Sequence, residues 1–146
     1  MYSSERILLI EDDSSEVALI KDALSDARIV NHLYPVSSGE EALEYFLGKG
    51  KYSDRVTYPL PCLVLLDLKI PGMGGLDVLG WIRKESQVPK VPVVILTHST
   101  NQDDLATAYE LGANSYLVKP FDLQAFRKLV KGINSYWIVL SEKPRL

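Results

Sequence analysis

Short apolar runs alternate along the chain with longer stretches in which apolar residues recur every three or four positions. The apolar runs cover residues 7–10, 63–66, 93–96 and 116–118. Most of them are apolar on both faces, as expected for strands of a parallel sheet that is covered by helices on both sides. A weaker extended stretch at 31–36 contains Pro35, which cannot donate a ladder hydrogen bond and therefore favours an edge strand.

The stretches between the runs carry helix signals. Asp13 and Ser38 each stand three residues before a glutamate, which is capping-box spacing. Gly112 is a C-terminal signal for the fourth helix, and the fifth begins after Asp122. The positions expected to face the core are Val17, Ile20, Leu24 and Ala27; Ala42, Leu43, Phe46 and Leu47; Leu76, Leu79 and Ile82; Leu105, Ala108, Tyr109 and Leu111; and Leu123, Phe126, Leu129, Val130, Ile133 and Trp137. This alternation predicts a doubly wound α/β fold, with a five-stranded parallel sheet and helices on both faces.

One long segment, residues 48–61, has no periodicity and contains Pro59 and Pro61. It is either a surface loop or an extra turn between the second helix and the third strand. No internal repeat or linker divides the chain. We therefore expect residues 1–146 to form a single domain, with its core at about 6–137 and no output domain.

The composition narrows the classes of function. The chain has 146 residues and a net charge of −3, which gives no general attraction to nucleic acid or to an anionic membrane. The single cysteine, Cys62, excludes an internal disulfide, and no apolar run approaches the roughly 20 residues of a membrane span. We therefore expect a cytoplasmic protein that binds neither nucleic acid nor membrane.

Polar side chains follow the predicted strands where each strand ends. Glu11, Asp12 and Asp13 follow the first strand, Asp67 the third, Thr97 the fourth and Lys119 the fifth. In an open parallel sheet, ligands bind outside these carboxyl ends. Neighbouring carboxylates repel one another and call for a cation, and such oxygen ligands suit Mg²⁺. A carboxylate can then attack phosphorus, while the ammonium and the hydroxyl stabilise the transferred oxygens. Asp13 is also explained as a helix N-cap.

The motifs at these strand ends resemble a known family. They are Ile10-Glu11-Asp12, Leu66-Asp67-Leu68, Ile95-Leu96-Thr97, Tyr116-Leu117-Val118-Lys119-Pro120-Phe121 and the turn Pro71-Gly72-Met73-Gly74-Gly75. Their order and spacing, from Arg6 to around Trp137, resemble the response-regulator receiver domain of two-component signalling. The resemblance implies the flavodoxin-like strand order 2-1-3-4-5. It also implies a protein that promotes its own phosphorylation and dephosphorylation without being a conventional enzyme.

The resemblance assigns a role to each matching position. Asp67 is expected to accept a phosphoryl group from a sensor histidine kinase in an Mg²⁺-dependent transfer. Asp12 is expected to bind Mg²⁺ directly, Glu11 to bind it through water, and Lys69 to supply its backbone carbonyl. Lys119 is expected to contact the phosphoryl group.

The resemblance also implies a conformational switch. Thr97 is expected to move toward the phosphoryl group, which lets Tyr116 rotate inward. This change remodels the face formed by the fourth helix, the fifth strand and the fifth helix, through which receivers bind downstream proteins or form homodimers.

Some positions depart from the usual pattern or modify it. His98 stands where receivers usually have a small residue, which puts access of small phosphodonors in question. Lys69 and Ser99 occupy positions that modulate dephosphorylation in the family, and we hypothesise that Lys69 shields the acyl phosphate from water. The bond between Lys119 and Pro120 is usually cis in receivers.

Other functions remain as alternatives. A pseudo-receiver scaffold would keep the same fold without phosphorylation. A phosphatase of the haloacid-dehalogenase type also uses a strand-end aspartate, but it would need a second carboxylate where this chain has Lys69. A flavodoxin-like FMN carrier would need a phosphate-binding loop where this chain has Glu11, Asp12 and Asp13.

The subtype is indicated by two segments. Residues 48–61 and 135–137 resemble those of the small stand-alone regulators paired with cyanobacterial phytochrome histidine kinases. This resemblance implies a phytochrome-type kinase as the phosphodonor and a homodimer as the assembly.

Overall fold

The structure is a computed structural model that describes residues 5–24 and 32–141, with the backbone alone for residues 134 and 136–141. The expected core positions Ala27 and Trp137 therefore lie outside the described side chains. The elements are β1 (Ile7–Ile10), α1 (Ser14–Leu24), β2 (Leu33–Val36), α3 (Gly39–Leu47), η1 (Gly50–Ser53), β3 (Leu63–Leu66), α4 (Gly75–Glu85), β4 (Val93–Thr97), α5 (Gln102–Glu110), β5 (Ser115–Val118) and α6 (Leu123–Ser141).

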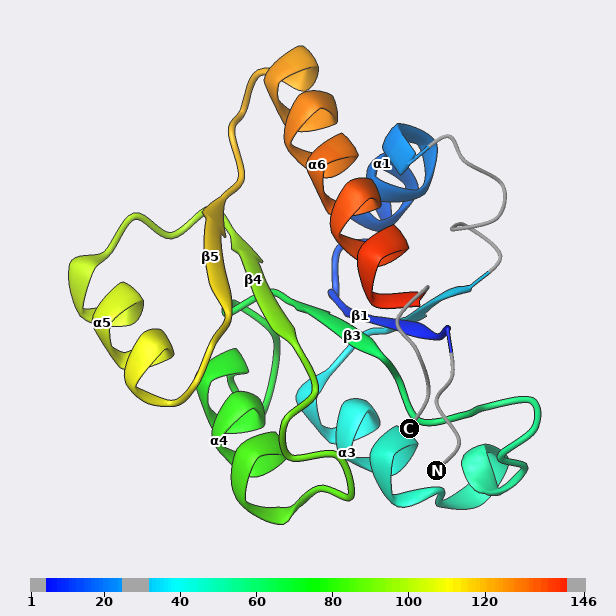
Figure 1. The fold of residues 1–146 in the computed structure, drawn as a ribbon. Helices are drawn as coiled ribbons and strands as arrows, with labels where there is room; N and C mark the ends of the chain where they lie inside the picture. Colours follow the sequence, from blue (N-terminus) through cyan, green and yellow to red (C-terminus); the bar gives the residue numbers. More distant parts are fainter. Residues whose placement is uncertain (1–4, 25–31, 142–146) are drawn as a thin grey trace.

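The strands form one parallel sheet in the order β2-β1-β3-β4-β5, which confirms the predicted fold (Figure 1). The strand that contains Pro35 lies at one edge, as predicted. Ile10 of β1 pairs in register with Leu66 of β3, and Leu66 pairs with Ile95 of β4. Because these strands end level with one another, the residues that follow them meet at one edge of the sheet.

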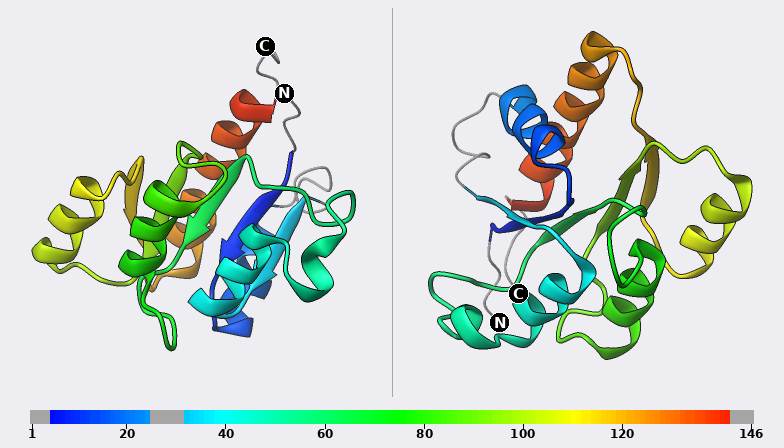
Figure 2. Two further views of the ribbon diagram at one scale, coloured as in Figure 1. Left: turned by 90° about the horizontal axis from the view of Figure 1, so that it is seen from below. Right: turned by 180° about the vertical axis from the view of Figure 1, so that it is seen from behind.

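Alternate residues of each strand supply two separate cores. Leu8, Val64 and Ile95 belong to the core under α3, α4 and α5. Their neighbours Leu9 and Leu65 belong to the core under α1 and α6. Figure 2 shows the two helical layers on opposite faces of the sheet. The strands are therefore apolar on both faces because both faces are covered.

The helix caps follow the sequence signals. Asp13 Oδ1 accepts hydrogen bonds from the backbone N–H groups of Ser15 and Glu16. Ser38 caps α3 by accepting from the backbone N–H of Glu41. Gly112, with φ at 101°, follows the end of α5 as predicted.

Some expected core positions are wrong. Leu47, Tyr109 and Leu123 are 46%, 49% and 49% exposed. Leu47 is the last residue of α3, and Leu123 is the first residue of α6. Tyr109 lies on α5, which packs at the β5 edge, so only Ala108 of that helix is buried. Helical spacing identifies a face, but it does not show how far the neighbouring layer extends.

The segment 48–61 contains the extra turn η1, and it seats Tyr52 in the core. A tyrosine cluster forms there, with ring centroids 5.0 to 6.2 Å apart. Its members are Tyr34, Tyr45, Tyr52 and Tyr58. Arg55 lies beside it and donates to backbone carbonyls at the end of α3. Within the described residues, no helix is both long and apolar enough to cross a bilayer.

Candidate phosphorylation site

The carboxyl edge of the sheet concentrates the buried polar chemistry of the protein. In the described part of the chain, the buried polar and charged residues are Glu11, Asp67, Thr97 and Lys119. Every one of them directly follows or ends a strand and was predicted as a site residue. Since burying such groups costs free energy unless they are paired, their gathering at one edge indicates a functional site.

A cation could be held by three carboxylates at this edge. Glu11, Asp12 and Asp67 each offer an oxygen, and these oxygens lie within 4.8 Å of one another. Asp12 is exposed, so a cation can be reached by water as well as by protein oxygens. An all-oxygen donor set that is open to solvent fits Mg²⁺ or Mn²⁺. The backbone N–H of Lys69 donates to Asp67 Oδ1 at 3.1 Å, and the metal-binding role of the Lys69 carbonyl stays a prediction.

Lys119 lies at the centre of the site with its side chain fully buried. Its Nζ is 3.2 Å from Asp67 Oδ2 and 2.5 Å from Glu11 Oε1. It also forms an ion pair with Glu16 Oε1. Sequence reasoning missed Glu16, because its position in a capping box already explained it. The available signal was that Glu16 stands one helical turn after Asp12, on the side of α1 nearest the strand ends.

The burial and the ion pairs shift the pKa values of these groups. Burial raises the pKa of Glu11 to about 7, although Lys119 acts against it. Burial also acts to raise the pKa of Asp67, but Lys119, the Lys69 N–H and the Thr97 hydroxyl outweigh it and bring that pKa below its usual value. Burial acts to lower the pKa of Lys119, but the surrounding carboxylates raise it to about 12. The site therefore keeps a carboxylate on Asp67 and an ammonium on Lys119 at neutral pH.

The expected switch residues are connected through Ser99. The backbone N–H of Ser99 donates to Thr97 Oγ1 at 3.3 Å, and the Tyr116 hydroxyl donates to the Ser99 carbonyl at 3.0 Å. Ser99 Oγ donates to Asp104 of α5 at 2.8 Å. A movement of Thr97 would therefore be transmitted through Ser99 to both Tyr116 and α5. The roles of Thr97 and Tyr116 as a switch stay a prediction.

Lys69 extends from the site toward α5. Its side chain is 70% exposed, and its Nζ is 3.7 Å from Asp104 Oδ2. An exposed pair at this distance contributes little to stability, so the ammonium can leave it at low cost. The shielding role of Lys69 stays a prediction.

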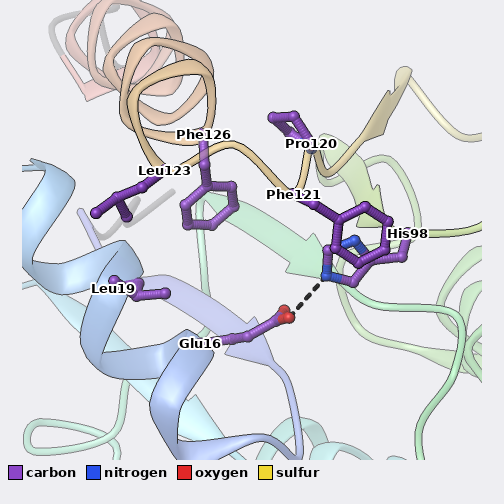
Figure 3. A pocket seen from close by; sticks show the side chains of 7 residues that line it. All are labelled: Glu16, Leu19, His98, Pro120, Phe121, Leu123 and Phe126. Carbon is purple, nitrogen blue, oxygen red and sulfur yellow. Dashed lines mark hydrogen bonds and ion pairs between the residues drawn. The ribbon is translucent and has the colours of Figure 1, made fainter.

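His98 lies beside the site and lines a cavity of about 210 Å³ (Figure 3). Its Nε2 is 2.8 Å from Glu16 Oε2, and its Nδ1 is 3.0 Å from the Lys119 carbonyl. The imidazole stacks on Phe121, with the ring centroids 4.5 Å apart. The Lys119–Pro120 bond is trans, since the described residues contain no cis peptide, so the cis bond implied by the resemblance is not observed.

Comparison with known proteins gives consistent matches. The family model of the response regulator receiver domain matches residues 7–131. The response regulator Rcp1 of Synechocystis sp. is 36% identical over 132 residues, which cover 90% of this chain and 88% of Rcp1. The probable methanogenesis regulatory protein FilR2 of Methanothrix harundinacea is 35% identical over 141 residues, which cover 94% of this chain and 86% of FilR2.

Solved structures agree with these matches. The phosphorylated cyanobacterial phytochrome response regulator RcpA superposes with a TM-score of 0.87 at 32% identity, covering 98% of this chain and 100% of RcpA. The Mn²⁺-bound form of response regulator Rcp1 gives a TM-score of 0.84 at 35% identity, over 98% of this chain and 99% of Rcp1. The predicted similarity to phytochrome-associated regulators is therefore confirmed. With its fold, its buried strand-end residues and these relatives in agreement, the chain belongs to the response regulator receiver domains of two-component signalling.

Proposed function

We propose that this protein is a phosphoacceptor response regulator that receives a phosphoryl group on Asp67. One observation carries this proposal: the buried ammonium of Lys119 lies 3.2 Å from Asp67 Oδ2, beside carboxylates that can hold a cation. An ionised aspartate next to a fixed positive charge is suited to accept a phosphoryl group, whose oxygens carry negative charge.

The transfer follows from the groups present. An Asp67 carboxylate oxygen attacks phosphorus, and the bond between phosphorus and the donor's histidine nitrogen breaks. That nitrogen keeps the bonding electrons and takes a proton from solvent. Lys119 stabilises negative charge on the transferred oxygens, and the Thr97 hydroxyl is placed to donate to one of them. The protein thus supports its own modification without being a conventional enzyme.

Glu11, Asp12 and Asp67 would hold the divalent cation. When bound, it supplies charge neutralisation between the carboxylates and the incoming phosphoryl oxygens. The Mn²⁺-bound form of the similar protein Rcp1 supports this part of the proposal.

The similarity to RcpA and Rcp1 supports a sensor histidine kinase of the phytochrome type as the phosphodonor. The connection from Thr97 through Ser99 to Tyr116 supports an output face built on α5, β5 and α6. On this face Tyr109 and Val118 are 49% and 42% exposed, so a downstream protein or a second copy of the chain could contact them.

The test is phosphorylation by acetyl phosphate with Mg²⁺, read by intact mass. Wild type is expected to gain one labile phosphoryl group, and Asp67→Asn none, because an amide is not a nucleophile. Asp77→Asn, the same substitution at an exposed residue of α4, is the matched control and should behave as wild type. If wild type gains no group from acetyl phosphate or from a panel of histidine kinases, the protein is a pseudo-receiver scaffold.

A further inference from the structure

Glu16 is a partly buried ion-pair partner that neither the strand-end motif nor the assigned metal cluster includes. Its side chain is only 18% exposed, and its two oxygens face different partners. Oε1 pairs with Lys119 Nζ, and Oε2 is 2.8 Å from His98 Nε2. Glu16 therefore connects the functional lysine to a residue in the loop after β4.

The carboxylates around Lys119 differ in whether they can also bind the cation. Glu11 and Asp67 belong to the cluster whose oxygens lie within 4.8 Å of one another, whereas Glu16 does not. A divalent cation in that cluster attracts the oxygens of Glu11 and Asp67 and repels the Lys119 ammonium. Glu16 is then the Lys119 partner that is left free of the cation.

His98 fixes Glu16 from the other side. Both ring nitrogens of His98 face acceptors, since Nδ1 lies 3.0 Å from the Lys119 carbonyl and Nε2 faces the Glu16 carboxylate. Stacking on Phe121 orients the ring, at an interplanar angle of 9° (Figure 3). Glu16, His98 and the backbone and side chain of Lys119 thus close a ring of contacts.

We propose that Glu16 is the positioning residue that keeps the Lys119 ammonium in the site when a divalent cation is bound. His98 holds Glu16 in place for this task. The inference rests on the proposed function of Asp67, and it explains how a fully buried lysine stays next to a bound cation. Glu16 acts through Lys119 and does not itself contact the phosphoryl group.

The first measurement needs no phosphorylation. In NMR spectra of protein labelled at the lysine ε-carbons, the Lys119 signal should remain distinct from those of exposed lysines when Mg²⁺ is added to wild type. In Glu16→Gln, which keeps the side-chain shape and loses the charge, Mg²⁺ should move that signal toward those of the exposed lysines. A Lys119 signal that responds to Mg²⁺ as in wild type overturns the inference.

The second measurement is the rate of phosphoryl gain from acetyl phosphate. Glu16→Gln should slow it about tenfold or more, because misplacing a group that stabilises the transferred oxygens by about 1 Å can lower a rate on the order of a hundredfold. Glu44→Gln, at an exposed residue of α3, should match wild type. An unchanged or faster rate in Glu16→Gln contradicts the inference. If wild type gains no phosphoryl group from acetyl phosphate or from a panel of histidine kinases, that result counts against the proposed function instead, and the NMR measurement alone then decides.

A second variant covers the case in which Glu16→Gln does not fold. His98→Phe keeps a ring that can stack on Phe121 and removes both polar contacts. It should change the Lys119 signal and the rate in the same direction as Glu16→Gln, but by less, because Glu16 keeps its charge. If both quantities match those of wild type, His98 has no part in positioning Lys119.

Discussion

The site at the carboxyl edge of the sheet and the tyrosine cluster beside α3 both contain charged groups that are shielded from solvent, fully at the site and partly at the cluster, but the two regions balance these charges in different ways. In the tyrosine cluster, Arg55 donates to the backbone carbonyls of Tyr45, Phe46, Tyr52 and Tyr58. Glu41 accepts hydrogen bonds from the Tyr52 hydroxyl and from the backbone N–H of Ser37. Each charge there is satisfied mainly by neutral partners within the protein.

At the sheet edge the charges do not balance. One ammonium, that of Lys119, faces the carboxylates of Glu11, Glu16 and Asp67, and Asp12 lies next to them. The raised pKa of Glu11 reflects its burial among these like charges. Full burial of charged side chains already separates the functional region from the tyrosine cluster, where Arg55 and Glu41 are only partly buried. An excess of negative charge, which a cation can relieve, is a second difference between the two regions.

Removal of the central ammonium should give the largest effect. Lys119→Met leaves buried carboxylates without a counter-charge, so we expect the free energy of unfolding to fall by about 3–5 kcal/mol in the absence of divalent cations. Addition of Mg²⁺ should recover part of this loss, because the cation neutralises the same carboxylates. Urea unfolding with and without Mg²⁺ measures both quantities.

The control is Lys131→Met, at an exposed residue of α6, which should leave stability within about 0.5 kcal/mol of wild type. If Lys119→Met were as stable as wild type without Mg²⁺, the charges at the sheet edge would not be coupled as described.

In the tyrosine cluster, Arg55→Met should have a smaller effect that does not depend on Mg²⁺. The substitution removes the guanidinium donors and leaves the backbone carbonyls that accept from them unpaired. We therefore expect the free energy of unfolding to fall by about 2–3 kcal/mol. Phosphoryl gain from acetyl phosphate should stay at the wild-type rate. The measurement is urea unfolding beside the mass assay, with Lys90→Met as an exposed control. A Mg²⁺-dependent loss in Arg55→Met would remove the distinction between the two regions.

These two regions also differ in how well the sequence predicts them. Glu11, Asp67, Thr97 and Lys119 could be placed together because parallel strands end at one edge, whatever the loops do. Glu16 was not placed with them, since it does not end a strand and its spacing already had an explanation as part of a helix cap; the fold shows that it pairs with Lys119. A sequence pattern assigns each side chain one role, whereas in the folded chain the carboxylate of the capping-box residue Glu16 also reaches the site.

The tyrosine cluster was beyond prediction for a different reason. Residues 48–61 have no apolar period, so nothing in the sequence indicated that Tyr52 enters the core. The position of Tyr52 depends on packing against Tyr34 and Tyr45, which come from other elements. The structure of an irregular segment depends on such long-range contacts, which cannot be read from a local sequence pattern.

The smallest expected effect concerns one hydrogen bond of the tyrosine cluster. Burial acts to raise the pKa of Glu41, but the hydroxyl of Tyr52, the contacts with Ser37 and the charge of Lys51 outweigh it, so the pKa lies below its usual value of 4.5. A carboxylate whose pKa is lowered by folding contributes stability above its unfolded pKa, and this contribution is lost as the pH falls through the folded value. Tyr52→Phe should therefore cost about 1–1.5 kcal/mol at neutral pH.

This cost should shrink as the pH is lowered below 4.5, because a protonated Glu41 gains less from the hydroxyl. Urea unfolding of wild type and Tyr52→Phe at neutral and acid pH gives the difference directly. Tyr58→Phe removes another hydroxyl of the cluster, one that is not among the groups bonded to Glu41 in the described structure, and its cost should not change with pH in this window. If the cost of Tyr52→Phe is the same at both pH values, the hydroxyl of Tyr52 does not stabilise the ionised carboxylate of Glu41. The charges of the tyrosine cluster are then less completely satisfied from within the protein than the contacts indicate.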